Sequence, residues 1–171
     1  MKKKIVLMLT VIMLIGLAGC GKNQINIKET GTSDNNEQMV QNIYENKRTE
    51  VKQKISEIKE RLPETSAEDK GTCGSKAKWY YKDNTLIIYG EGVITEDTWH
   101  KSNIVINTVV IDSGITKLGN NMFSGLGSEV GKNIENFYIA DGLEEIGLST
   151  FVNCDCLSEI VLPPSLYFID G

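Results

Sequence analysis

The chain has 171 residues, of which 40% are hydrophobic and 24% charged, and a formal net charge of −5. This length allows one modest domain with appendages. The acidic balance argues against nucleic acid as a partner and against attachment to a membrane through a polybasic surface.

The N-terminus has the parts of an export signal. Three lysines precede an apolar run that ends in small residues before Cys20. Because a spanning helix needs about 20 apolar residues, we interpret residues 1–19 as a signal peptide rather than a membrane span. Without them, 15 basic residues stand against 23 acidic ones, a net charge of −8.

The end of this segment, Leu17-Ala18-Gly19-Cys20, resembles the lipobox of bacterial lipoproteins. The resemblance implies cleavage between Gly19 and Cys20 and acylation of the Cys20 thiol, with palmitate as an acyl group. We therefore expect a lipid anchor at the extracytoplasmic face of the cell membrane, with residues 20–33 as a flexible tether. The alternative is an ordinary secretory signal with a chance cysteine.

The next stretch, 34–62, is predicted to be a helix. Asp34 and Glu37 form a capping-box pattern at its start, and Pro63 ends it. Its narrow apolar stripe has 4/3 spacing with Arg48 in one slot, and consists of Tyr44, Val51, Ile55, Ile58 and Leu62. The interpretations are a stalk that holds the domain off the membrane and a short coiled coil. We favour a lone or loosely docked stalk and a monomer, because the stripe is short and interrupted.

A polar linker, 63–70, precedes a segment that is predicted to be rich in β structure, 71–105. Two runs of aromatic and β-branched residues flank Asp83-Asn84, a hairpin signal. We interpret this segment as an N-terminal cap that covers the first coil of a repeat region. Its aromatic residues are expected in the core or in cross-strand pairs, with a carbohydrate-stacking platform as the alternative; they are Trp79, Tyr80, Tyr81 and Tyr89.

The remaining segment, 106–171, repeats itself about two and a half times. Apolar residues recur at +4, +7 and +12 from Ile111 and again from Ile139, and at +4 and +7 from Leu162. Such a period in the twenties is typical of a solenoid. A polar insertion, Gly127 to Asn133, lengthens the first copy. The predicted core of the repeats is Ile111, Ile115, Leu118, Phe123, Ile139, Leu143, Ile146, Phe151, Leu162, Leu166 and Ile169.

The repeats must stack to be stable. One unit buries side chains worth on the order of 10 kcal/mol, whereas ordering its backbone and side chains costs roughly 35 kcal/mol. Because the third copy stops at Gly171, before the phenylalanine position of the other two, we expect the sequence to be a truncated part of a longer array.

The run from Gly142 to Leu166, with its Ile-Gly, Thr-Phe, Cys and Leu-x-x-Ile-x-Leu-Pro elements, resembles the BspA-like leucine-rich repeats of bacterial surface proteins. The Cys73 and Trp79 segment resembles the β-rich part that often precedes them. The resemblance implies a right-handed solenoid of short parallel strands at the cell surface, with a role in adhesion. Thr150 stands where the family usually has alanine.

The residue types that carry chemistry do not form a recognisable site. Cys154 and Cys156 are too closely spaced for the usual zinc pattern or an unstrained mutual disulfide. A bond from Cys73 to either is one alternative, and buried free thiols are the preferred one. His100, the single histidine, has no triad around it, and Asp141, Glu144 and Glu145 are interpreted as a solvated turn. We therefore expect no metal, no cofactor and no enzymatic activity.

The resulting hypothesis is a lipid-anchored cell-surface protein whose leucine-rich-repeat solenoid binds a protein or a glycan. The alternative is an envelope spacer without a specific ligand.

Overall fold

The structure is a computed structural model that describes residues 33–102, 104–124 and 131–170, with side chains from residue 36 on except those of 101 and 102. The predicted signal peptide, Cys20, most of the tether and the first part of the insertion therefore lie outside the described residues.

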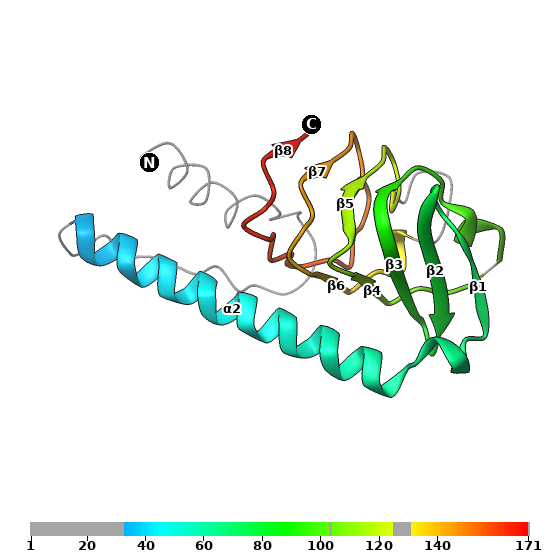
Figure 1. Cartoon of the computed structure of the whole chain (residues 1–171). Helices are drawn as coiled ribbons and strands as arrows, with labels where there is room; N and C mark the ends of the chain where they lie inside the picture. The colour runs from blue at the N-terminus through cyan, green and yellow to red at the C-terminus, as the bar shows by residue number, and fades with distance from the viewer. Residues whose placement is uncertain (1–32, 103, 125–130, 171) are drawn as a thin grey trace.

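A long helix lies along a short β-solenoid (Figure 1). The elements are α2 (Ser33–Arg61), η1 (Glu64–Ser66), β1 (Asp69–Thr72), β2 (Lys76–Lys82), β3 (Thr85–Ile94), η2 (Thr98–Ser102), β4 (Thr108–Ile111), β5 (Ile115–Leu118), η3 (Gly131–Asn133), β6 (Asn136–Ile139), β7 (Glu145–Ile146) and β8 (Phe168–Ile169).

The predicted hairpin is confirmed. Strands β2 and β3 pair antiparallel, and the turn residues Asp83 and Asn84 have φ of 47° and 56°, as a type I′ turn requires. β1 adds an outer antiparallel strand to β2. β3 is longer than the sequence suggests and also pairs in parallel with β4 and β5. The expected segments 71–105 and 106–171 thus share one sheet.

The coils form two sheet surfaces. Sheet A consists of β1, β2, β3, β4 and β6, and sheet B of the end of β3 with β5, β7 and β8. Register partners form continuous rows in both, Ile88–Ile111–Ile139 in sheet A and Ile94–Leu118–Ile146–Ile169 in sheet B. The solenoid prediction is confirmed. In the third copy, however, Leu162 packs partly buried against the core without belonging to a strand.

An aromatic column fills the solenoid along its axis. The rings of Trp99 and Phe123 stack at 5.5 Å between centroids, and those of Phe123 and Phe151 at 6.3 Å. Phe137 packs edge-on against both phenylalanines. In the coil that begins with β3, Trp99 thus occupies the position that Phe123 and Phe151 occupy in the next two coils.

Most of the predicted repeat core is buried, from Ile111 through Ile146. Phe151, Leu162 and Leu166 are only partly buried. Ile169 is 50% exposed, so its assignment to the core is wrong. The reason is its position on β8, which is at the edge of sheet B and which no further strand of the described residues covers.

The coils approach most closely at a glycine corner. A Cβ on Gly114 would lie 1.9 Å from the Gly90 carbonyl oxygen, and one on Gly142 would lie 2.2 Å from that of Ser113. In the last coil this position is Ser165, whose hydroxyl accepts a hydrogen bond from the Gly142 amide and donates one to the Leu143 carbonyl. Glycine is therefore required at Gly114 and Gly142, whereas the Ser165 side chain is accommodated by its two hydrogen bonds to the preceding coil.

The prediction of a lone or loosely docked stalk is wrong. Helix α2 lies across the outer face of sheet A and buries its apolar stripe there (Figure 1). All members of the stripe except Tyr44 pack in one cluster with Tyr80, Ile87 and Val110, which point outward from sheet A. Burial of so many apolar side chains stabilises the contact, because each contributes about 1.5–3 kcal/mol. Among the described helices, none is both long and apolar enough to span a membrane.

Candidate binding surfaces of the solenoid

The contact between α2 and sheet A is fixed by charge as well as by apolar packing. Lys59 pairs with Asp112 in one coil, while Arg48 and Lys52 both pair with Asp141 in the next, each at 2.7 Å. Burial opposes ionisation of Asp141, but hydrogen bonds from Lys52 and Arg48 outweigh it and lower the pKa of this carboxyl. Asp141 lies in a turn with its side chain 42% exposed, as predicted, and in addition it belongs to the helix interface.

Near its N-terminus, α2 holds the last coil of the solenoid. The Arg48 guanidinium donates to the Val161 carbonyl and the Tyr44 hydroxyl to the Leu162 carbonyl, both at 2.9 Å. Lys47 also pairs with Glu159. Residues 159–162 belong to no strand. Side chains of the helix thus bond carbonyl groups that a neighbouring strand would otherwise bond.

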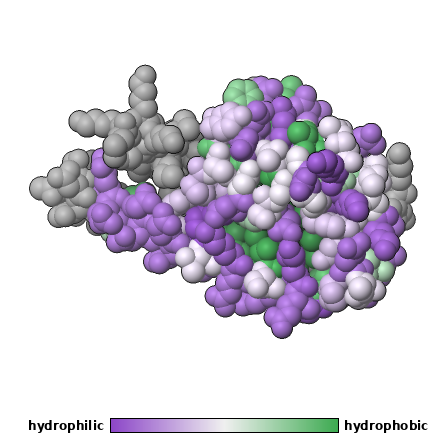
Figure 2. Space-filling view, viewed as in Figure 1, coloured by the Kyte–Doolittle hydropathy of each residue, from purple (hydrophilic) through white to green (hydrophobic). Residues whose placement is uncertain are grey.

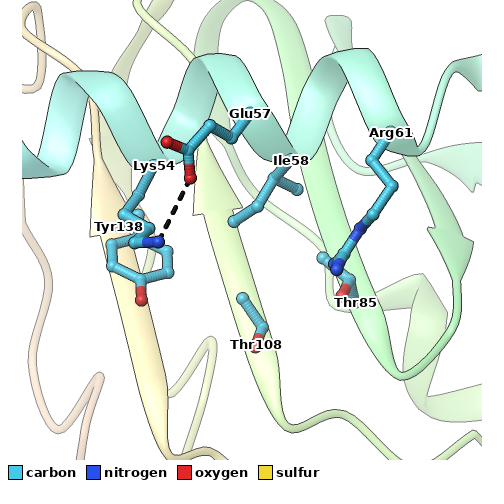
Figure 3. Close-up of a pocket in the computed structure, with 7 residues that line it drawn as sticks. All are labelled: Lys54, Glu57, Ile58, Arg61, Thr85, Thr108 and Tyr138. Atoms are coloured by element: carbon cyan, nitrogen blue, oxygen red, sulfur yellow. Dashed lines mark hydrogen bonds and ion pairs between the residues drawn. The ribbon is translucent and has the colours of Figure 1, made fainter.

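A groove of about 370 Å³ lies where α2 crosses sheet A (Figure 3). Thr85 and Thr108, register partners on β3 and β4, form part of its floor, and Tyr138 lies on the next strand. Lys54 is paired with Glu57, whereas Arg61 has no ion pair among the described residues and extends toward Thr85. The groove is small and polar, and its one apolar wall is Ile58.

Sheet B has a different outer face. The register places one outward row across its strands, Val93–Lys117–Glu145–Phe168. Lys117 and Glu145 pair at 2.7 Å, and the Tyr167 hydroxyl donates to the Glu145 carboxylate at 2.8 Å. The bonds from Lys117 and Tyr167 lower the pKa of Glu145. The row therefore combines an ion pair with an exposed apolar side chain at each end.

Figure 2 shows how hydrophilic and hydrophobic residues are distributed on one side of the molecule. The visible face of α2 is hydrophilic, and a compact apolar area lies between the helix and the solenoid. The partly buried residues that pack against the helix interface include Tyr138, Ala140 and Val161. Further apolar atoms are visible near the upper edge.

The three cysteines of the described residues have different surroundings. Cys73 and Cys154 are buried free thiols, as predicted, and burial raises the pKa of each to about 12. The Cys154 thiol donates to the Phe123 carbonyl of the preceding coil at 3.1 Å. Cys156 is exposed, so its assignment as a buried thiol is wrong. The three are all free, and a disulfide from Cys73 is not formed.

The other residues that the sequence analysis considered as candidate site residues make contacts within the fold. The prediction that the hairpin aromatics are core is confirmed for Trp79, Tyr80 and Tyr81, which are buried, and Tyr89 packs edge-on against Tyr80. His100 Nδ1 lies 2.6 Å from a carboxylate oxygen of Asp97. Thr150 is buried and its hydroxyl bonds the Gly147 carbonyl, which explains how a polar residue replaces alanine there. In the described part of the chain, no His, Cys, Asp and Glu side chains gather into a group of three or more suited to a metal ion.

The match to one protein family agrees with this geometry. Residues 87–171 match the family model described as "BspA type Leucine rich repeat region (6 copies)". The crystal structure of a leucine-rich repeat protein from Eubacterium ventriosum ATCC 27560 is 24% identical over 50% of this chain, with a TM-score of 0.41. This chain spans 23% of that protein. No curated protein matches. The match begins within β3, where the structure places the first coil. The solenoid is therefore similar to the leucine-rich repeats of the BspA type.

Proposed function

We propose that this chain is a lipid-anchored cell-surface protein that binds an extracellular protein or glycan through the outer face of sheet B. Leucine-rich repeats of this type suggest a protein-binding or surface role. The lipobox resemblance of residues 17–20 supports export and attachment through Cys20. Such a solenoid is typically a binding scaffold rather than an enzyme.

The observation that carries the proposal is the unequal covering of the two sheets. Helix α2 occupies the outer face of sheet A, whereas the row Val93–Lys117–Glu145–Phe168 on sheet B is not covered by any described element. The row joins polar and apolar side chains, and non-obligate protein interfaces likewise contain both polar and non-polar area. A ligand would therefore meet sheet B first.

The binding test uses charge reversal at the centre of this row. We expect the full chain, in lipid nanodiscs, to bind immobilised extracellular-matrix extract or purified cell-wall material saturably. Lys117→Glu places two like charges side by side and should weaken binding at least tenfold, since reversing charge at a contact opposes complementarity. Surface plasmon resonance measures the change.

Two further variants separate binding from folding. The double variant Lys117→Glu with Glu145→Lys restores an ion pair but reverses its direction, so it should fold normally and still bind weakly. Lys54→Glu makes the same charge change in the groove beside α2 and should bind normally. Loss of binding with Lys54→Glu alone would move the site to that groove, and absence of saturable binding would favour the spacer alternative.

Attachment is tested separately. Replacing Cys20 by Ser removes the thiol that would carry the lipid, so the protein should move from the membrane fraction to the soluble fraction after cell lysis. A Ser variant that still sediments with membranes would show that the lipid anchor is wrong.

A further inference from the structure

The groove beside α2 has a polar row of sheet A as its floor. Thr85 and Thr108 are register partners at the start of β3 and β4. The next outward row on these strands and β6 is Ile87–Val110–Tyr138, of which Ile87 and Val110 are buried beneath the helix. Successive outward residues of a strand lie about 6.6 Å apart. The two threonines therefore lie just outside the strip that the helix covers, and line the groove at its edge.

Both threonine hydroxyl groups retain capacity for hydrogen bonds. Thr85 is only 4% exposed, and its hydroxyl donates one long bond of 3.3 Å to the Asp83 carbonyl. Within the described residues, the Thr108 hydroxyl has no hydrogen-bond partner. A hydroxyl group has one donor and two acceptor sites, and buried polar groups normally use them. A ligand with hydroxyl groups of its own would complete these bonds.

The groove carries one positive charge that is not neutralised. Lys54 and Glu57 pair at 3.1 Å, so together they add no net charge. Arg61, in the last turn of α2, forms no ion pair with the described residues and extends toward Thr85 (Figure 3). A cation near a helix C-terminus interacts favourably with the helix dipole whichever way its side chain points, so the dipole does not explain this direction. The guanidinium is thus available to an anionic group in the groove.

The size and the apolar lining of the groove suit one small ring. Its volume of about 370 Å³ is at the lower end of the roughly 300–1,000 Å³ that ligand pockets usually have. Ile58 lines its middle, and Tyr138 lines the end away from Arg61 (Figure 3). These two side chains offer apolar surface, whereas the threonines and Arg61 offer polar groups. This combination matches a sugar ring, whose C–H bonds and hydroxyl groups point in different directions.

We infer that the groove binds a sugar acid, that is, a single pyranose ring that carries a carboxylate. The planar guanidinium of Arg61 holds the carboxylate through two parallel hydrogen bonds. Thr85 and Thr108 exchange hydrogen bonds with ring hydroxyl groups, and the C–H face packs on Ile58 and Tyr138. A phosphate ester fits less well, because its charge of about −1.5 to −2 exceeds the single uncompensated positive charge. The inference goes beyond the proposed function, which concerns the outer face of sheet B.

Saturation-transfer difference NMR on the full chain in nanodiscs tests this site, with empty nanodiscs as the blank. The probe is sodium glucuronate, and we expect saturable binding with a dissociation constant on the order of 1 mM, the affinity usual for so small a ligand. Glucose, which lacks the carboxylate, and acetate, which lacks the ring, should each bind at least tenfold more weakly. Inorganic phosphate at an equal concentration should displace less than about a tenth of the glucuronate, since its charge is not matched.

Matched substitutions locate the site. Arg61→Gln should weaken glucuronate binding at least tenfold, because it removes the carboxylate partner from an exposed position without disturbing the fold. Thr108→Val should weaken it severalfold, since valine has nearly the same volume without the hydroxyl. Lys78→Gln also removes an exposed charge from sheet A. Lys78 is the register partner of Tyr89, four residues along β3 from Thr85, so the affinity should stay within twofold. Thermal melts followed by circular dichroism check that all three variants fold alike.

Two charge reversals separate this site from matrix binding. Lys54→Glu adds a negative charge to the groove and should weaken glucuronate binding at least fivefold, while matrix binding persists. Lys117→Glu should do the reverse, so failure at one site leaves the test of the other intact. The inference would be overturned by no saturable glucuronate binding, by equal binding of glucose, acetate or phosphate, or by an unchanged affinity of Arg61→Gln. A loss with Lys78→Gln as large as that with Arg61→Gln would overturn it as well.

Discussion

The outer faces of the two sheets belong to the same coils but differ in chemistry. On sheet A, Tyr80, Ile87 and Val110 point outward and are buried beneath α2. On sheet B, Lys117 and Glu145 occupy the outward row and no described element covers them. A solenoid coil thus has two outward surfaces, and the residues at the outward positions decide which one receives the helix.

The difference is already present in the strand sequences. β3 and β4 contain the unbroken apolar runs Leu86-Ile87-Ile88 and Val109-Val110-Ile111, which are typical of strands buried on both faces. β5 instead reads Ile115-Thr116-Lys117-Leu118, with its two middle residues polar. Unbroken apolar runs therefore indicate a covered sheet, and interrupted ones an open surface.

Removing apolar volume from the covered side gives the largest expected effect. Ile55→Ala should lower the free energy of unfolding by about 3 kcal/mol, because Ile55 is buried between α2 and sheet A and the truncation leaves a cavity. The better helix propensity of alanine offsets only a few tenths of this loss. Urea denaturation followed by circular dichroism measures the change.

The same substitution on the open side is the control. Ile169→Ala removes an equal volume from a side chain that is half exposed at the edge of sheet B, so it should cost less than about 1 kcal/mol. Equal losses for Ile55→Ala and Ile169→Ala would mean that the helix contact contributes little to stability, which would invalidate the comparison of the two faces.

The repeat spacing was sufficient to predict the solenoid. The positions from which the spacing is counted, Ile111 and Ile139, and the +7 positions, Leu118 and Ile146, became the register rows, because a side chain at a fixed place in each coil meets its equivalent in the next. The spacing did not reveal that Trp99 fills the first phenylalanine position, since the indole stands in a coil whose other residues belong to the hairpin. A search for any aromatic residue about one period before Phe123 would have found it.

The docking of α2 could not be predicted from the helix sequence. Arg48 interrupts the apolar stripe, which favoured a solvated stalk, yet it is 3% exposed. Its burial depends on the Val161 carbonyl and on Asp141, which are 113 and 93 residues away in the chain. Local spacing carries no information about such partners.

The comparison of Arg48 with Lys52 involves the smallest expected changes in stability. Both side chains bond Asp141 at 2.7 Å, from adjacent turns of α2. Arg48→Ala should cost about 2 kcal/mol, because it removes a hydrogen bond to the Val161 carbonyl as well as a buried charge partner. Lys52 is 58% exposed, so Lys52→Ala should cost about 0.5 kcal/mol or less.

Hydrogen–deuterium exchange then shows where the stability is lost. With Arg48→Ala, exchange should accelerate first in residues 157–162, because the helix no longer holds carbonyl groups that belong to no strand, while β4 and β6 retain their ladder bonds. Lys52→Ala should leave exchange in this segment unchanged. If both variants loosened it equally, the ion pair with Asp141 would hold the last coil, and the bond from Arg48 to the Val161 carbonyl would be incidental.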